Sequence, residues 1–133
     1  MTFSFDTSDV FVMQAINSGN GLFSSGVTLD EIIEFVDATN KSILRLDELN
    51  EALAKLLTIG FIKIHQPKFY VTDIFKKEKR KHCKRTSDRF KEFDEIKKML
   101  SLYEKNDYYE LIQQRISEDE YDIALKTYRI KHR

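Results

Sequence analysis

The chain has 133 residues, 41% of them hydrophobic, which suits one compact domain or a small domain with a helical extension. Because 22 basic residues balance 22 acidic ones, the net charge is zero and no overall field attracts nucleic acid or a membrane surface. The single cysteine excludes an internal disulfide, and no apolar run is long enough for a transmembrane helix.

Two short amphipathic helices are predicted near the N-terminus. The first begins at the capping oxygens of residues 7–9 and stops at the glycines that follow residue 18. After a small turn, Val27 could form a short strand. Thr28 then opens a capping box with Glu31, three residues later, and a second helix is predicted from there to about residues 38–40.

A third helix and a β-hairpin are predicted next. Gly60 suits the left-handed conformation that ends a helix, and β-forming residues on both sides of the turn at Gln66-Pro67-Lys68 predict the hairpin. The third helix is predicted from apolar residues that recur at steps of three and four, namely Leu46, Leu49, Ala52, Leu53, Leu56 and Leu57.

The order helix, short strand, helix, helix, hairpin resembles the winged helix-turn-helix family over roughly residues 7–73. The residues that carry the resemblance are the third-helix run 49–57, the Gly60-Phe61-Ile62 exit and the closing Tyr70-Val71-Thr72. The chain is also similar to a group of uncharacterised winged-helix-like proteins through Asp37-Ala38-Thr39-Asn40, Glu48-Leu49 and Ala52-Leu53. The resemblance implies an α+β, mostly α fold: a winged helix (three helices plus a β-hairpin wing) at residues 1–75, with a C-terminal helical extension at 76–133.

The extension is predicted to contain a charged helix at residues 73–85 and a further helix capped by Thr86-Ser87-Asp88. A short helix near Tyr108 and a last helix that opens with a capping box at Ser117 follow. The helix after residue 88 has an apolar seam of Phe90, Phe93, Ile96, Leu100 and Tyr103, and the last helix has Tyr121, Leu125 and Tyr128 on one face. These seams can pack on the domain or on a second copy, so we expect a homodimer through the C-terminal helices.

The sequence offers little for catalysis, and the protein is not expected to be an enzyme. The three histidines lie far apart, and there is no glycine-rich phosphate loop or serine elbow. His82 and Cys83 are adjacent, but neighbours on a helix point in different directions and no second pair has zinc spacing. Nearby cations are expected to lower the pKa of the Cys83 thiol, although an incidental cysteine is the simpler interpretation. No metal or cofactor is expected.

Nucleic acid is the first functional hypothesis, because residues 76–91 hold nine basic and two acidic residues. In a helix-turn-helix the second helix of the pair enters the major groove, while wing and flanks hold phosphates. This predicts a DNA-binding or transcription-associated protein in which Arg45 reads guanine and Asn50 reads adenine in double-stranded DNA. The other predicted DNA contacts are Lys41, Ser42, Lys63, Lys68, Lys76, Lys77, Arg80 and Lys84.

The alternative is a winged-helix protein-interaction module that does not bind DNA. Residues 46–57 hold three acidic residues and one lysine, and carboxylates that face phosphates cost affinity. An acidic third helix together with a basic segment suits a protein partner, and residues 76–85 can also be read as an exposed helix that keeps the protein soluble. The N-terminal residues lack a signal-peptide pattern, so a cytoplasmic location without membrane contact is expected.

Overall fold

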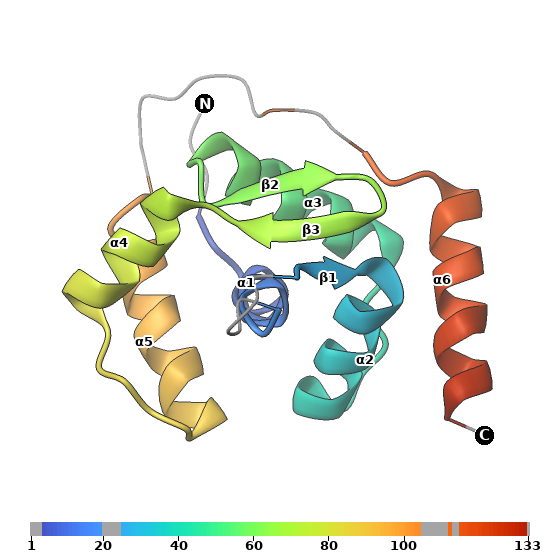
Figure 1. Ribbon diagram of the computed structural model, residues 1–133, viewed down its shortest axis with the longest axis horizontal. Helices are drawn as coiled ribbons and strands as arrows, with labels where there is room; N and C mark the ends of the chain where they lie inside the picture. Colours follow the sequence, from blue (N-terminus) through green and yellow to red (C-terminus); the bar gives the residue numbers. More distant parts are fainter. Residues whose placement is uncertain (1–3, 20–24, 105–111, 113–114, 133) are drawn as a thin grey trace.

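The computed structural model of the protein describes residues 4–19, 25–104, 112 and 115–132 (Figure 1). The described elements are, in chain order, α1 (Thr7–Asn17), β1 (Val27–Thr28), α2 (Leu29–Asn40), α3 (Leu46–Thr58), β2 (Ile62–His65), β3 (Lys68–Val71), α4 (Asp73–His82), α5 (Arg89–Ser101) and α6 (Glu118–Lys131). The short helix predicted near Tyr108 falls mainly on residues 105–111, which lie outside the described residues.

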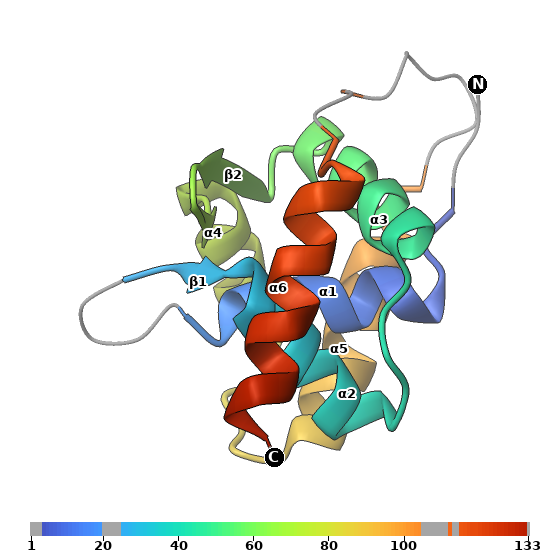
Figure 2. The same cartoon turned by 90° about the vertical axis from the view of Figure 1, so that its right-hand side faces the viewer.

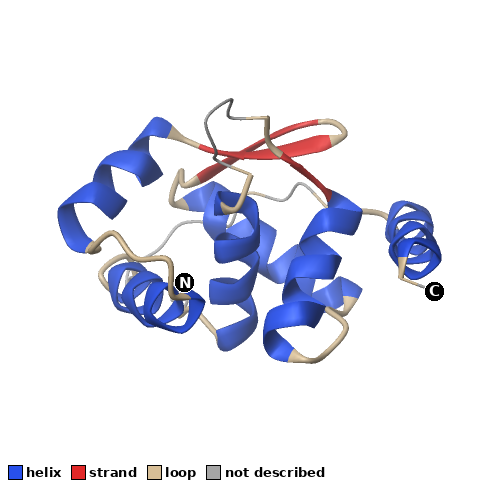
Figure 3. Cartoon of the chain, turned by 60° about the horizontal axis from the view of Figure 1, so that its bottom comes forward, coloured by secondary structure: helices blue, strands red, loops and turns tan. Residues whose placement is uncertain are grey.

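The strands form a small antiparallel sheet in the order β1-β3-β2. In the hairpin Ile62 pairs with Val71 and His65 with Lys68, while Val27 of β1 pairs with Phe69 on the other side of β3. The sheet lies along one side of a mainly helical body (Figure 3). The predicted fold class is therefore confirmed: the protein is α+β and mostly α, with a winged-helix-like arrangement of its elements.

Local signals set most of the element boundaries. Thr28 and Glu31 form the predicted capping box of α2, and Ser117 forms one with Glu120 at α6. Gly60 has φ +78°, the left-handed conformation expected after α3. The predicted start of α1 at residues 7–9 was one to three residues too late: the N-cap is Asp6, and its side chain and that of Asp9 form a capping box.

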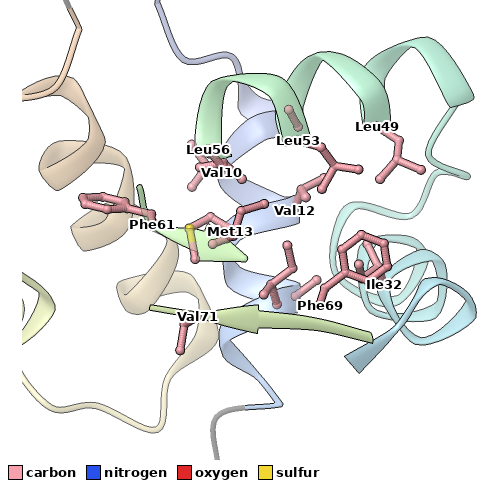
Figure 4. Packing of buried hydrophobic residues seen from close by; sticks show 14 of the residues in the cluster. Val10, Val12, Met13, Ile32, Leu49, Leu53, Leu56, Phe61, Phe69 and Val71 are labelled. Atoms are coloured by element: carbon pink, nitrogen blue, oxygen red, sulfur yellow. The ribbon is translucent and has the colours of Figure 1, made fainter. Parts of the chain in front are cut away.

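The hydrophobic core lies between α1, α3 and the sheet (Figure 4). Side chains from α1 and α3 meet there, and Phe69 of β3 closes the core from the sheet. The labelled core residues of Figure 4 are Val10, Val12, Met13, Ile32, Leu49, Leu53, Leu56, Phe61, Phe69 and Val71. The leucines predicted from the periodicity of α3 face this core. Their burial removes apolar surface from water and so stabilises the packing of α1, α2 and α3.

The same core continues into α4 and α5. Phe75 of α4 is fully buried, as are Ile96 and Leu100 of α5, and the Phe61 ring packs edge-on against both Phe75 and Tyr103. Most of the apolar seam predicted for α5 is thus packed against the core of the same chain. Phe90, the first residue of that seam, is the exception, because it is 81% exposed.

Helices α4 and α5 lie at one end of the molecule and α6 at the other (Figures 1 and 3). In Figure 2, α6 runs along the side of the body, where it packs mainly against α2. Ala124 is the one buried residue of this helix. The C-terminal helices therefore lie at two ends of the molecule. Helices α4 and α5 contribute buried side chains to the core, whereas α6 is only lightly packed.

Candidate interaction surfaces

One stripe of α3 is contacted by two described residues that precede α6, Ile112 and Ile116. Asn50, Ala54 and Thr58 follow one another at steps of four and so form one stripe on α3. The Asn50 amide donates to the carbonyl of Ile116 at 3.1 Å and accepts from its N–H at 2.7 Å. At the other end of the stripe, the N–H of Ile112 donates to the Thr58 hydroxyl at 2.8 Å. The stripe is thus closed at both ends by residues from ahead of α6.

Two residues predicted to read bases are already engaged within the chain. Asn50 was expected on an exposed face, and this is wrong: it is 9% exposed, and its amide oxygen and nitrogen are both occupied by Ile116. Arg45 is exposed, but its guanidinium makes two 3.1 Å contacts with the carboxylate of Asp47, in the fork geometry that arginine favours with carboxylates.

The part of α3 that is open to solvent is acidic. Within this helix only Asp47 and Glu51 are exposed, and Glu48 is half-buried. Negative charge at the first turn is favourable beside the positive end of the helix dipole, which gives Asp47 and Glu48 a structural role. A groove-reading helix needs the opposite charge, because carboxylates repel phosphates. The exposed surface of α3 therefore does not fit a DNA-reading helix.

The other predicted DNA contacts are spread over three regions. Lys41 and Ser42 are exposed just after α2. On the hairpin, the Lys63 ammonium lies 6.0 Å from the centre of the Tyr70 ring, and Lys68 donates to the carbonyl of Ser25 at 3.0 Å. The rest lie on α4 or just after it, where Lys77, Arg80 and Lys84 are exposed and Lys76 is half-buried.

The predicted contacts on α4 do not lie near the start of α3 (Figure 1). The start of α3 lies near α6, since the hydroxyl of Tyr121 donates to the carbonyl of Leu44 at 2.6 Å. Helix α4, which holds five of the nine basic residues of segment 76–91, is at the opposite end of the molecule (Figure 1). A DNA duplex bound at the start of α3 would therefore lie close to α6 and away from the basic residues of α4.

An apolar hollow of about 430 Å³ lies between α1, the end of α2 and the start of α5. The rings of Phe11 and Phe93 pack with their centres 4.5 Å apart in its wall, and exposed Phe90 borders it. Its charged lining residues are both cations, Lys41 and Arg89. The volume falls within the range of ordinary ligand and side-chain pockets. The sequence analysis missed this hollow, because its walls come from three helices far apart in the chain.

Polar contacts join the helices that form the walls of the hollow. The amide nitrogen of Gln14 donates to the carbonyl of Arg89 and to a carboxylate oxygen of Glu92, each at 3.0 Å. The Arg89 guanidinium lies 5.1 Å from the centre of the Phe35 ring, a cation–π distance that joins α5 to α2. Gln14 is a polar residue in an otherwise apolar part of α1, and this was the one feature of the sequence that could have indicated the contact between α1 and α5.

The expected lowering of the Cys83 pKa was wrong, and the interpretation as an incidental cysteine stands. The thiol is half-buried, and burial raises its pKa, with Glu95 and Glu92 acting in the same direction and Lys79 against it. Burial and the two carboxylates outweigh the effect of Lys79, so the thiol is not activated. Among the described residues there is also no group of three or more side chains suited to holding a metal ion.

Comparisons of the chain with protein families, curated proteins and solved structures found no match. The winged-helix resemblance therefore rests on the order and pairing of the elements alone. In the described part of the chain, every helix is too short or too polar to cross a membrane.

Proposed function

We propose that the protein is a winged-helix-like protein-interaction module, the second of the two classes suggested by its sequence. The observation that carries the proposal is the apolar hollow between α1, α2 and α5, with the exposed ring of Phe90 at its border. Exposed aromatic rings beside a preformed pocket are typical of the residues that dominate protein binding. The partner we propose is a peptide segment with one bulky apolar side chain flanked by acidic residues.

The chemistry of the hollow supports this partner. Phe11 and Phe93 offer an apolar surface for the anchoring side chain, which gains free energy by leaving water. Lys41 and Arg89 are the charged residues of the lining, so flanking carboxylates meet complementary charge and basic segments are repelled. Among the described residues no ion pair involves Lys41, and the Arg89 guanidinium lies over the Phe35 ring, so both cations can attract an acidic partner.

The geometry of α3 also favours this class over sequence-specific DNA binding. Its outward stripe is engaged by Ile112 and Ile116, and its exposed residues are acidic. The DNA hypothesis makes a separate prediction: if α3 reads bases, Arg45→Ala changes the preference of the protein among duplex sequences. Our proposal expects the same preference, or none, for the wild type and Arg45→Ala.

The test of the proposal is a selection of displayed random peptides on the immobilised full chain, followed by titration of the recovered peptides. We expect sequences with one Leu, Ile or Phe among Asp and Glu. Phe90→Ser should weaken their binding by about tenfold, the usual effect of removing an aromatic anchor. Lys41→Glu should also weaken it, because the variant repels the flanking carboxylates.

Two control variants match these changes elsewhere on the surface. Ile74→Ser removes an exposed apolar side chain from α4, and Lys97→Glu reverses an exposed charge on α5. Neither residue lines the hollow, so both variants should bind the peptides like the wild type. Recovered peptides that bind Phe90→Ser as tightly as the wild type, or that are basic, would contradict the proposal.

The proposal also includes the location and the oligomeric state predicted from the sequence. A cytoplasmic location stays a prediction, and so does a homodimer through the C-terminal helices. Support for the dimer is now confined to apolar residues that α5 and α6 leave exposed, because the rest of the α5 seam is buried within the chain.

A further inference from the structure

A second hollow, of about 400 Å³, lies between the end of α1 and the basic face of α4. Lys76, Lys79 and Arg80 occupy neighbouring positions on this face, at steps of three and four along the helix. Cys83 ends α4 in an extended conformation, and Arg85, two residues further on, lines the same hollow. Four cationic side chains from two adjacent segments therefore converge on one depression.

The positive charge of this hollow is only weakly compensated. Lys76 lies 3.9 Å from the carboxylate of Asp73, and Lys79 lies 4.0 Å from that of Glu92, both at the limit of an ion pair. Among the described residues, no ion pair within 4.0 Å joins Arg80 or Arg85 to a carboxylate. Its lining contains no acidic residue, since Asn17, Phe75 and Cys83 complete it. The hollow thus gathers four cations, of which only Lys76 and Lys79 have a carboxylate partner, each at the limit of an ion pair.

A structural role explains only part of this arrangement. Lys79 and Arg80 lie in the last turn of α4, where cations are favourable beside the negative end of the helix dipole. Lys76 lies before that turn, and Arg85 lies beyond the helix, so neither gains much from the dipole. Their convergence on the same hollow is better explained by an anionic ligand.

We propose that this hollow binds phosphate groups, supplied by a free polyphosphate compound or by the backbone of a polynucleotide. Two guanidinium forks and two ammonium groups can surround the oxygens of a phosphate from several directions, which matches its charge and its number of acceptors. A single carboxylate would leave most of these donors unused. The site lies on different residues from the peptide hollow, so it is independent of the proposed function.

The experiment uses the full chain with two probes: inorganic pyrophosphate, followed by calorimetry, and a fluorescent random-sequence duplex, followed by anisotropy. Cys83 is the only cysteine in the chain, and it lines the hollow, so the rate of its alkylation by N-ethylmaleimide reports local occupancy. We expect binding at about 50 mM NaCl that weakens at about 200 mM, because phosphate contacts are sensitive to salt. Bound probe should slow the alkylation of Cys83.

Arg80→Glu tests the site directly, with Lys97→Glu as the matched control. Both residues are exposed, and both substitutions change the net charge equally, but only Arg80 lines the hollow. Arg80→Glu should weaken binding by about tenfold and remove the protection of Cys83, whereas Lys97→Glu should leave both nearly unchanged. Circular dichroism of each variant checks that it folds.

The two probes distinguish the source of the phosphate. Protection of Cys83 by pyrophosphate indicates a free phosphate compound as the ligand, and protection by the duplex alone indicates a polynucleotide. The proposal is overturned if neither probe binds at low salt, or if Arg80→Glu and Lys97→Glu weaken binding equally, since binding would then reflect general charge and not this hollow.

Discussion

At the scale of single residues, the most consequential feature is a buried ion pair between α1 and α3. The side chain of Lys55 is 5% exposed, and its ammonium lies 2.8 Å from Asp9 and 3.2 Å from Glu51. Burial by itself lowers the pKa of Lys55, but the contacts with Asp9 and Glu51 outweigh this and raise it. Lys55 is therefore charged in the core, where its partners replace water.

Removal of Lys55 should be strongly destabilising. Lys55→Ala leaves the buried carboxylate of Asp9 without its partner, and breaking such a pair costs about 3–5 kcal/mol. Urea unfolding measures this loss. Lys97→Ala, at an exposed site on α5, should change the free energy of unfolding by less than about 0.5 kcal/mol. A loss for Lys55→Ala as small as that of the control would show that the pair contributes little.

Lys41 provides a prediction of the opposite sign. It ends α2 with φ +58°, a left-handed conformation in which a β-carbon is unfavourable. Lys41→Gly should therefore stabilise the protein by about 0.5–1 kcal/mol, measured by thermal or urea unfolding. Lys41→Ala removes the same charge but keeps the β-carbon, so it should give no such gain. Equal effects of the two variants would assign the change to charge instead of backbone conformation.

At the scale of elements, α6 is held mainly by polar contacts. The hydroxyl of Tyr128 donates to Asp37, Lys131 lies 2.7 Å from Asp30, and a ring nitrogen of His132 lies 2.8 Å from Glu34. All three acidic partners lie on α2. With only Ala124 buried, this helix contributes little apolar area and should open more readily than the elements of the core.

The attachment of α6 should depend on pH. Burial by itself would raise the pKa of Asp30, but hydrogen bonds from Lys131 and Thr28 outweigh this and lower it. Folding therefore favours the ionised carboxylate, so its contribution is present above the ordinary pKa of 3.8 and is lost as pH falls below it. The hydrogen bond to Asp30 raises the pKa of Lys131, so its contribution is present below 10.5 and is lost as pH rises above it.

Hydrogen exchange measures this dependence, after correction for the intrinsic effect of pH on exchange rates. Protection of α6 should fall as the pH is lowered below about 4, while the buried amides of α3 keep theirs longer. Lys131→Ala should lower the protection of α6 at neutral pH, and Lys126→Ala, an exposed lysine on the same helix, should not. Equal loss of protection in α3 and α6 would show that the two unfold together.

At the scale of the whole molecule, the surfaces left after folding limit how two copies could meet. Ile96 and Leu100 of α5 are buried in the core and cannot contribute to a dimer. On α6, Ile123 and Ile130 are 66% and 62% exposed, and their spacing of seven residues places them on one face. The predicted homodimer therefore depends on α6.

Sedimentation equilibrium tests this dimer. We expect a concentration-dependent dimer for the wild type and a monomer for Ile123→Ser/Ile130→Ser, because burial of these side chains supplies the apolar area of the contact. Ile74→Ser removes a side chain of similar exposure from α4, at the other end of the molecule, and should leave the dimer intact. A wild type that remains monomeric at all concentrations would remove the dimer prediction.

The local features of the fold could be predicted from the sequence. Caps at Thr28 and Ser117, the left-handed Gly60 and the leucine stripe of α3 all depend on neighbours within a few residues, so their pattern can be read along the chain. The hairpin was predicted on the same basis. These elements and their order were sufficient to predict the fold class.

Which polar residues are free to bind a partner could not be predicted, because it depends on contacts between distant parts of the chain. The amide of Asn50 is bound by Ile116, 66 positions away, and Lys55 is paired with Asp9, 46 positions away. Both hollows are likewise formed by helices that are distant in sequence, and burial, not the basic neighbours, sets the direction of the Cys83 pKa. Burial and charge depend on every atom nearby in space, whereas a sequence pattern records only the neighbours along the chain.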